Sequence, residues 1–438
     1  MENNSQHTPS HWSRPLKSAG LVLAGKSAQG VIALIYTALA ARTLDTEAFG
    51  VLALIHGTVY GLSQLLRLHN WPAVVRYGAM ALHANDNARL ARLIGFTFKL
   101  DIAAALISML ALQLFLRSIA QWFGLAPDSY NMLRLYAISI VLMIPVPTHF
   151  GILRLFEQFR QIGIQSTLEP MMRLIGTCYL WWVGADLFAF LALWFTATII
   201  SRLTLFYRAW AELASHGIRF KDCINASWTS DEQGIWYFIL SGSYTNGLQS
   251  AQSNISLMLV GGFLGPAAAG IFRIAQQYAT ILVKPTQKLL IPAIYPEFAK
   301  VMASTNIKGM HEMMWRCTAV AASIALLVLG LLATFGHQLI LLSVGNNYLS
   351  AYLPMLWLAA AGAATVAGFA LEPALSAGGH MRPLVIAQTT GLLVYVIAMM
   401  VLLPSYQLTG AGISALISAM IQAMILFYAA YSRIPRPL

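Results

Sequence analysis

Long runs of apolar residues alternate with short polar segments along the whole chain. Runs such as residues 102–116, 319–335 and 391–403 are continuous, whereas transmembrane β-strands alternate apolar and polar residues over about 10 positions. An α-helix satisfies its own backbone hydrogen bonds in hydrocarbon, and about 20 apolar residues cross a bilayer. The pattern therefore predicts an all-α integral membrane protein.

Apolar runs, read against turn and charge signals, predict twelve transmembrane helices. They are expected near residues 18–41, 49–69, 91–116, 130–153, 165–183, 187–209, 234–262, 267–295, 313–335, 349–375, 383–403 and 409–431. The second and fourth helices are expected to continue past the hydrocarbon. Pro72 and the pair Pro145 and Pro147 mark expected bends.

Basic residues in the connecting loops predict the orientation, because cytoplasmic loops carry an excess of Lys and Arg. With twelve helices and a cytoplasmic N-terminus, one side holds fourteen such residues and the other holds only Arg42 and Arg117. The fourteen are Arg14, Lys17, Arg89, Arg92, Arg154, Arg160, Arg208, Arg219, Lys221, Lys300, Lys308, Arg382, Arg433 and Arg436. The prediction is a membrane protein with both termini in the cytoplasm.

The longest cytoplasmic connection divides the chain into two halves of six helices. The expected organisation is a cytoplasmic tail (1–17), an N-lobe (18–210), a cytoplasmic linker (211–233), a C-lobe (234–431) and a second tail (432–438).

Composition agrees with a membrane protein. Hydrophobic residues make up 58% of the chain and charged residues 10%, where a soluble domain carries about 25% charged residues. The net charge of +11 comes from basic residues dispersed among short loops, which argues against a nucleic-acid partner. Cys178, Cys223 and Cys317 are widely separated and form no metal-binding motif.

The two halves can be superposed in sequence at an offset of 220 residues. Residues 44–50 and 264–270 both read L-x5-G between two long apolar runs. A second similarity follows in each half: Phe123-Gly124 precedes Tyr130, and Val344-Gly345 precedes Tyr348. Two similarities in the same order predict a duplicated six-helix unit. Parallel repeats of this kind form transporters that bind cargo in a central cavity between the halves.

Charged residues inside the spans need an explanation, since each costs about 2.5–3.5 kcal/mol at the bilayer centre. Arg67, Arg76, Arg202 and Arg316 lie near cytoplasmic helix ends and are expected to extend to the interface. Glu169 and Arg173 are spaced i,i+4 and are expected to neutralise each other.

Four further cations have no acidic residue within one helical turn: Lys26, Arg273, Lys284 and Lys288. We expect them to face a water-filled space between the halves, where they would bind an anionic cargo. The alternative is interhelical pairing with one of the three acidic residues in the spans, Asp101, Glu169 and Glu372. Each of these acids is also a candidate for a coupling proton or Na⁺, and equally for a structural partner of a Lys or Arg. Candidate polar contacts in the cavity are Tyr244, Asn246, Gln249 and Asn254.

Catalytic motifs are absent from the sequence: there is no GxxxxGK[ST], no HExxH and no GxSxG. We therefore expect a protein that is not an enzyme and that has no cofactor or metal. Its energy would come from an H⁺ or Na⁺ gradient, from the membrane potential or from removal of the product.

Several segments resemble the polysaccharide-transporter branch of the multidrug/oligosaccharidyl-lipid/polysaccharide (MOP) exporter superfamily, the Wzx-type flippases. Residues 41–50 (ARTLDTEAFG) look like the family's first turn, with Asp45 in place of the usual glycine that Gly265 keeps in the second turn. Residues 269–275 with 290–296 look like its eighth helix, and residues 345–348 and 375–382 look like the segments before and after its tenth. The resemblance covers nearly the whole chain.

The resemblance implies a bacterial inner-membrane protein with a two-lobed, twelve-helix fold. It implies that the protein moves undecaprenyl-pyrophosphate-linked repeat units of O-antigen, capsule or exopolysaccharide to the periplasmic leaflet. It implies that Lys26 and Arg273 lie near the diphosphate, and that a polysaccharide polymerase and a chain-length regulator are partners. Two alternatives remain open at this stage. One is an ion-coupled small-molecule exporter resembling multidrug and toxic compound extrusion (MATE) proteins, and the other is an envelope polysaccharide polymerase or ligase.

Overall fold

The computed structural model consists of helices, with no strand among the residues that it describes. It describes residues 13–230, 232–303, 307–368, 371–377 and 380–433. The side chains of residues 13–27, 245–246, 249–251, 281–303, 307–312, 373, 376–377, 381 and 433 lie outside this description. Each of the twelve expected spans is mostly helical over its described residues, and the second ends early, because α2 stops at Leu66.

The first half contains nine helices, and a short helix follows in the linker. They are α1 (Ser13–Thr43), α2 (Thr46–Leu66), α3 (Trp71–His83), α4 (Asn87–Trp122), α5 (Pro127–Ala137), α6 (Ile140–Met143), α7 (Val146–Leu155), α8 (Phe159–Val183), α9 (Leu187–Ser215) and α10 (Phe220–Asn225). The second half contains α11 (Ile235–Ala303), α12 (Ile307–Ser343), the 3₁₀ helix η1 (Asn346–Ala351), α13 (Tyr352–Ala367), α14 (Leu371–Ala377) and α15 (Met381–Arg433).

Several boundaries differ from the sequence prediction. The sixth helix continues as α9 to Ser215, inside the segment expected as the linker (211–233), and α10 also lies in that segment. The third and ninth helices run beyond 116 and 335 to Trp122 and Ser343. Polar residues at these ends can stay helical once the chain leaves the hydrocarbon, so a hydropathy pattern underestimates helix length.

Breaks inside the long helices separate neighbouring spans. In α11 the helix is interrupted at Gly265 (φ 83°), and in α15 at Gln407 (φ 50°), so each of these elements holds two expected spans. The fourth span is divided into α5, α6 and α7, and the last break falls at the expected Pro145 and Pro147. A proline lacks the N–H that the helix would use and clashes with the preceding turn.

Aspartates begin three of the spans. The side chains of Asp45, Asp86 and Asp186 each accept a hydrogen bond from the backbone N–H three residues later, at 2.6, 2.8 and 3.1 Å. Asp45 has extended backbone (φ −68°), whereas Gly265 at the equivalent position of the second half has a positive φ of 83°. The aspartate in the first turn therefore serves as a helix cap, and only the second turn requires glycine.

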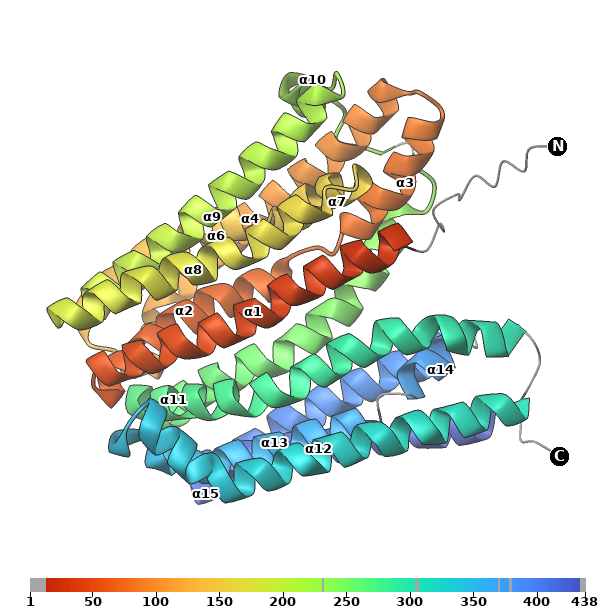
Figure 1. Cartoon of the computed structure of the whole chain (residues 1–438). Coiled ribbons are helices and arrows are strands. Elements are labelled where there is room, and N and C mark those ends of the chain that lie inside the picture. Colours follow the sequence, from red (N-terminus) through yellow and green to blue (C-terminus); the bar gives the residue numbers. More distant parts are fainter. Residues whose placement is uncertain (1–12, 231, 304–306, 369–370, 378–379, 434–438) are drawn as a thin grey trace, which may run out of the picture.

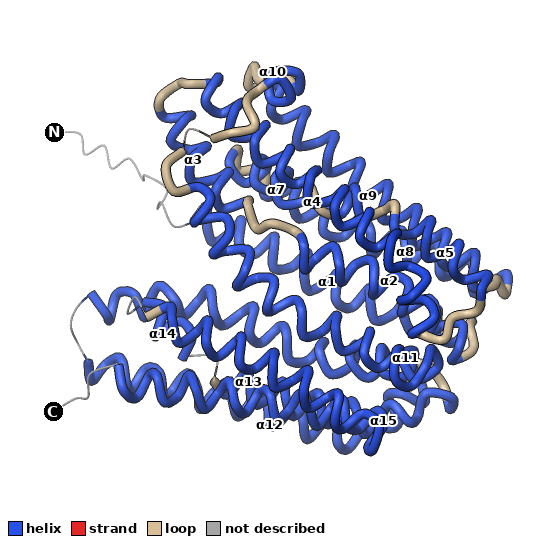
Figure 2. Tube along the Cα trace, turned by 180° about the vertical axis from the view of Figure 1, so that it is seen from behind, coloured by secondary structure: helices blue, strands red, loops and turns tan. Residues whose placement is uncertain are grey.

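The two halves form two lobes that meet at one end and separate at the other (Figures 1 and 2). One buried apolar core contains residues of both lobes, including Phe49 and Leu52 of α2 with Tyr348 and Met355. A second core lies at the end near α3 and α10, where N-lobe residues pack with Ile235 and Ile239 of α11, and a third joins α12 to α15 near α14. We call the shared-core end the closed end and the other, where α3 and α14 lie, the open end.

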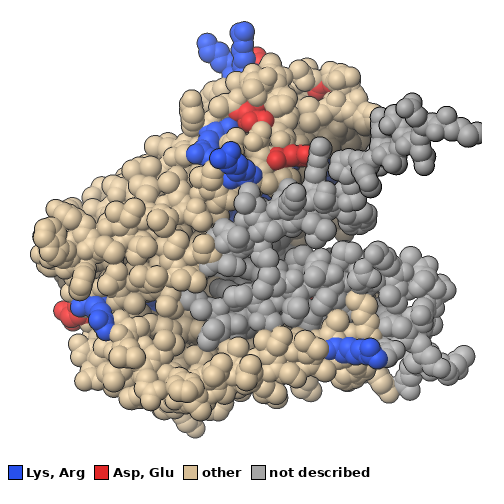
Figure 3. Space-filling model, viewed as in Figure 1, with Lys and Arg blue, Asp and Glu red and all other residues tan. Residues whose placement is uncertain are grey.

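Large apolar side chains cover the outside of the molecule, as lipid requires. Leu114 of α4 is 80% exposed and Leu342 of α12 is 76% exposed. On the face drawn in Figure 3, the charged side chains gather towards the ends of the helices. Eight helical stretches of the described part of the chain are long and apolar enough to cross a membrane, and one of them, Arg382–Ser432, holds two expected spans.

Candidate functional site

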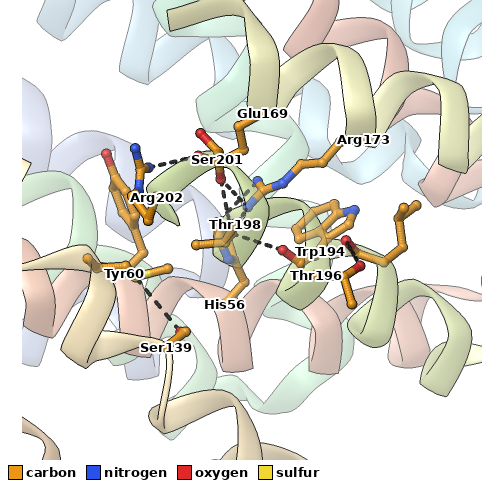
Figure 4. Close-up of polar contacts among 12 residues, drawn as sticks. His56, Tyr60, Ser139, Glu169, Arg173, Trp194, Thr196, Thr198, Ser201 and Arg202 are labelled. Carbon is orange, nitrogen blue, oxygen red and sulfur yellow. Dashed lines mark hydrogen bonds and ion pairs between the residues drawn. The ribbon is translucent and has the colours of Figure 1, made fainter. Parts of the chain in front are cut away.

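A buried ion cluster joins α8 and α9 in the N-lobe (Figure 4). One carboxylate oxygen of Glu169 accepts a hydrogen bond from Arg173 at 2.6 Å, and the other accepts one from Arg202 at 2.7 Å. The Thr198 hydroxyl lies 3.1 Å from Glu169 and 2.9 Å from Arg173. Both Glu169 oxygens are therefore bound by cationic groups.

Helix periodicity brings these four side chains together. Glu169 and Arg173 are spaced i,i+4 on α8, and Thr198 and Arg202 have the same spacing on the adjacent α9. Residues at this spacing share one helix face, so two such faces pack against each other. The side chains are only 6% (Arg173), 16% (Glu169) and 18% (Arg202) exposed.

Aromatic rings enclose the Arg173 guanidinium. Its central carbon lies 4.9 Å from the ring centre of Trp194 and 5.9 Å from that of Tyr36. His56 of α2 bridges the guanidinium and Tyr136, with its two ring nitrogens 3.5 Å from Arg173 and 2.8 Å from the Tyr136 hydroxyl. These ring faces and neutral groups surround the cation without adding a second negative charge to that of Glu169.

A third cation reaches this region from the other lobe. Arg273 of α11 is half-buried and interacts electrostatically with Tyr36, Tyr60 and Arg173. It makes no hydrogen bond or ion pair with another described residue. We refer to Glu169, Arg173, Arg202 and Arg273 as the arginine cluster, which has three positive charges and one negative charge.

The cluster and its surroundings also contain hydrogen-bond donors that have no acceptor among the described residues. The Nε groups of Arg173 and Arg202 and the indole nitrogen of Trp194 are buried without an acceptor among the described residues. Buried donors without a partner are uncommon in folded proteins. An excess of positive charge and of donors is the chemistry that an anion would satisfy.

A second polar cluster lies in the N-lobe around Asp101 of α4. Its two carboxylate oxygens accept hydrogen bonds from the Asn70 amide at 2.9 Å and from the Thr148 hydroxyl at 2.5 Å. Asp101, Asn70 and Thr148 are fully buried. Lys99, two residues away, instead donates to the carbonyl of Ala226.

The remaining sequence candidates are dispersed. Tyr244 is 48% exposed, and its hydroxyl lies 2.9 Å from that of Thr389 on α15. Half-buried Asn254 packs against α2 at Gly61, where a Cβ would lie 2.8 Å from the Asn254 Cβ. Glu372 of α14 is half-buried and makes no hydrogen bond or ion pair with the described residues. The side chains of five further candidates lie outside the described part of the chain: Lys26, Lys284, Lys288, Asn246 and Gln249.

Sequence reasoning named Glu169, Arg173 and Arg273 of the arginine cluster but missed Arg202 and the contacts between the helices. The expectation that Arg202 extends to the interface is wrong, because its guanidinium pairs with Glu169 inside the lobe. His56 was an ordinary isolated histidine in the sequence, yet it contacts Arg173. The i,i+4 spacing of Glu169 and Arg173 predicted that they neutralise each other, and the structure confirms the ion pair.

Comparison with known proteins supports the architecture. No family model matches the chain. It is 27% identical over 323 residues to the inner membrane protein YghQ of Escherichia coli (strain K12), a match that covers 74% of this chain and 90% of that protein.

Among solved structures, the chain resembles a multidrug resistance MATE family transporter of the MOP superfamily in an inward-facing conformation. The TM-score is 0.74 at 14% identity, and the match covers 93% of this chain and 94% of the other. The outward-facing conformation of a multidrug resistance MATE family transporter gives a TM-score of 0.58 at 14% identity, over 96% of each chain. The protein is thus a multi-pass, all-helical membrane protein with the two-lobed fold of MATE transporters of the MOP superfamily.

Proposed function

We propose that this chain is a membrane transporter that moves an undecaprenyl-diphosphate-linked oligosaccharide from the cytoplasmic to the periplasmic leaflet by alternating access. The arginine cluster is the observation that supports an anionic cargo. Arg173 and Arg202 share a single carboxylate, Glu169, and Arg273 of the other lobe adds a third positive charge that interacts with Arg173. A diphosphate offers the negative charge and the acceptor oxygens that this site lacks.

The lobe arrangement suits such a cargo. The lobes diverge at the open end, where α3 and α14 lie (Figure 1), and in this proposal the headgroup enters at that end. The exposed surface is rich in large apolar side chains, so a polyprenyl tail could remain in lipid while the headgroup crosses. The fold matches more closely an inward-facing than an outward-facing transporter, as expected for a protein ready to receive cytoplasmic cargo.

Export of small molecules by an ion-coupled mechanism is the second candidate. Its support is the fold itself, since the similar solved structures are multidrug resistance transporters. Cationic drugs, however, would be repelled by the surplus of arginine in the site. A polymerase or ligase has less support, because the similar proteins of known structure are transporters.

Export of polysaccharide in a strain that depends on this chain tests the proposal. We expect Arg273→Ala to reduce surface polymer at least tenfold and Arg273→Lys to retain part of it, because a lysine keeps the charge without the planar guanidinium. Arg134→Ala is the matched control, since Arg134 is exposed on α5. Lys26→Ala is expected to act like Arg273→Ala. If Lys26→Ala and Arg273→Ala both leave export intact at normal protein levels, the diphosphate site is wrong.

A further inference from the structure

Asp101 is a fully buried carboxyl group in α4 whose hydrogen-bond partners are both neutral. It accepts from the Asn70 amide at 2.9 Å and from the Thr148 hydroxyl at 2.5 Å. No Lys, Arg or His among the described residues lies within ion-pair distance of it. This is the opposite of Glu169, which is bound by two guanidinium groups. A carboxyl held only by neutral groups inside a lobe can exist as the acid or as the anion.

Apart from Arg67, the basic groups on the surrounding helices contact residues other than Asp101. Arg67, at the end of α2, is the cation that acts electrostatically on Asp101. The other basic groups on neighbouring elements lie against rings or a carbonyl: Arg76 over Tyr77 and Phe238, Lys99 on Ala226 and near Trp228, His149 beside Phe98 and Phe206, and Arg154 over Trp71.

The Asn70 side chain leaves one hydrogen-bond acceptor of this pocket without a donor. It is fully buried, and its amide nitrogen faces Asp101, Thr148 and the Thr97 carbonyl. Its oxygen, however, has no donor. A neutral Asp101 would bring one further O–H donor into a pocket that contains an unsatisfied acceptor, and a rotation of the amide would let the two meet.

The neighbouring residue connects this pocket to the other half of the chain. The backbone N–H of His69 donates to the Ser243 hydroxyl of α11 at 2.7 Å. The His69 ring is fixed by the Trp71 indole, which donates to it at 2.8 Å. Asn70 is also the N-cap residue of α3. A change in the Asn70 hydrogen bonds therefore acts on a junction between α2 and α3 that touches both halves.

We propose that Asp101 is a proton-binding site, and that uptake and release of its proton changes the contact between the α2–α3 junction and α11. The proton comes from water and returns to water, and the O–H bond of Asp101 is the one bond made and broken. A proton fits better than Na⁺, because both carboxylate oxygens face hydrogen-bond donors, whereas a metal ion needs several oxygen lone pairs. The inference rests on the proposed transport by alternating access and does not depend on which cargo is moved.

Infrared difference spectroscopy of the purified full-length protein tests protonation. Between mildly acidic and mildly alkaline pH, we expect a carboxylic-acid carbonyl band that disappears in Asp101→Asn and persists in Asp128→Asn. Asp128 is the control because it is exposed in the first turn of α5. Thr148→Val removes one donor and should change the midpoint of that band's titration. The proposal fails if Asp101→Asn retains the band, or if Thr148→Val leaves the midpoint unchanged.

Distances between the lobes test the coupling. Spin labels on cysteines introduced at exposed His83 of α3 and exposed Arg382 of α15, in a chain without its three native cysteines, report the separation at the open end. We expect the distance distribution to change between acidic and alkaline pH, and to be the same at both in Asp101→Asn. A pH response that survives in Asp101→Asn, that is lost in His149→Gln instead, or that requires Na⁺ at constant pH overturns the proposal.

Discussion

Gly50 of α2 and Gly270 of α11 lie against each other at the closed end. A Cβ placed on Gly270 would lie 3.0 Å from the Gly50 nitrogen, and one placed on Gly50 would lie 1.8 Å from the Pro266 carbonyl oxygen. These glycines end the two L-x5-G segments of the internal repeat. Corresponding residues of the two halves therefore meet where the lobes join. Beside them, the Phe49 and Tyr348 rings pack edge to face at 5.9 Å between centres.

Gly50→Ala is expected to open this contact, because the added methyl group cannot be accommodated without moving α2 from α11. Overpacking of this kind costs about 1–3 kcal/mol. Thermal unfolding in detergent should show a lower midpoint for the variant. Gly330→Ala is the control, since a Cβ at Gly330 of α12 meets nothing within 4 Å. Equal thermal-unfolding midpoints for the two variants would contradict close packing of α2 against α11 at the closed end.

Glu169→Gln is expected to destabilise the N-lobe strongly. It leaves Arg173 and Arg202 buried beside each other without their shared carboxylate. Breaking a buried ion pair from one side costs about 3–5 kcal/mol, whereas removing both partners costs much less. Thermal unfolding should therefore show a large loss for Glu169→Gln, partial recovery on adding Arg202→Gln, and little effect of Glu157→Gln at an exposed turn. A Glu169→Gln variant as stable as the parent would mean that the ion pairs are unimportant.

Cys223 is expected to resist thiol reagents at neutral pH. It lies buried in α10, its carbonyl packs against Gly95 of α4, and burial raises the pKa of its thiol to about 12, with a smaller effect from Asp222. The reactive thiolate is thus scarce up to pH 9 or so. Mass spectrometry after treatment with a water-soluble maleimide should find Cys223 unmodified, and a cysteine introduced at exposed Lys221 modified. Equal labelling of both sites would show that α10 does not pack against α4.

Local sequence patterns predicted the spans but not the polar contacts between them. The break at Gly265 and the pair of Glu169 and Arg173 could be predicted because each depends on residues within one turn. Arg202 lies 33 residues from Glu169 on another helix, and Asn70 lies 31 residues from Asp101. The packing of whole helices decides which helix faces meet, and the periodicity within one segment does not determine that packing.

The central claim is that the arginine cluster, to which both lobes contribute, receives an anion. The most direct measurement is the thermal stabilisation of the purified protein by undecaprenyl diphosphate, compared with undecaprenol and with a lipophilic cation, for the parent, Arg273→Ala and Arg134→Ala. We predict that undecaprenyl diphosphate alone stabilises the parent and Arg134→Ala, and that the effect is lost in Arg273→Ala. Stabilisation by the cation in preference to the diphosphate, or an equal effect of the diphosphate on Arg273→Ala, would contradict the account.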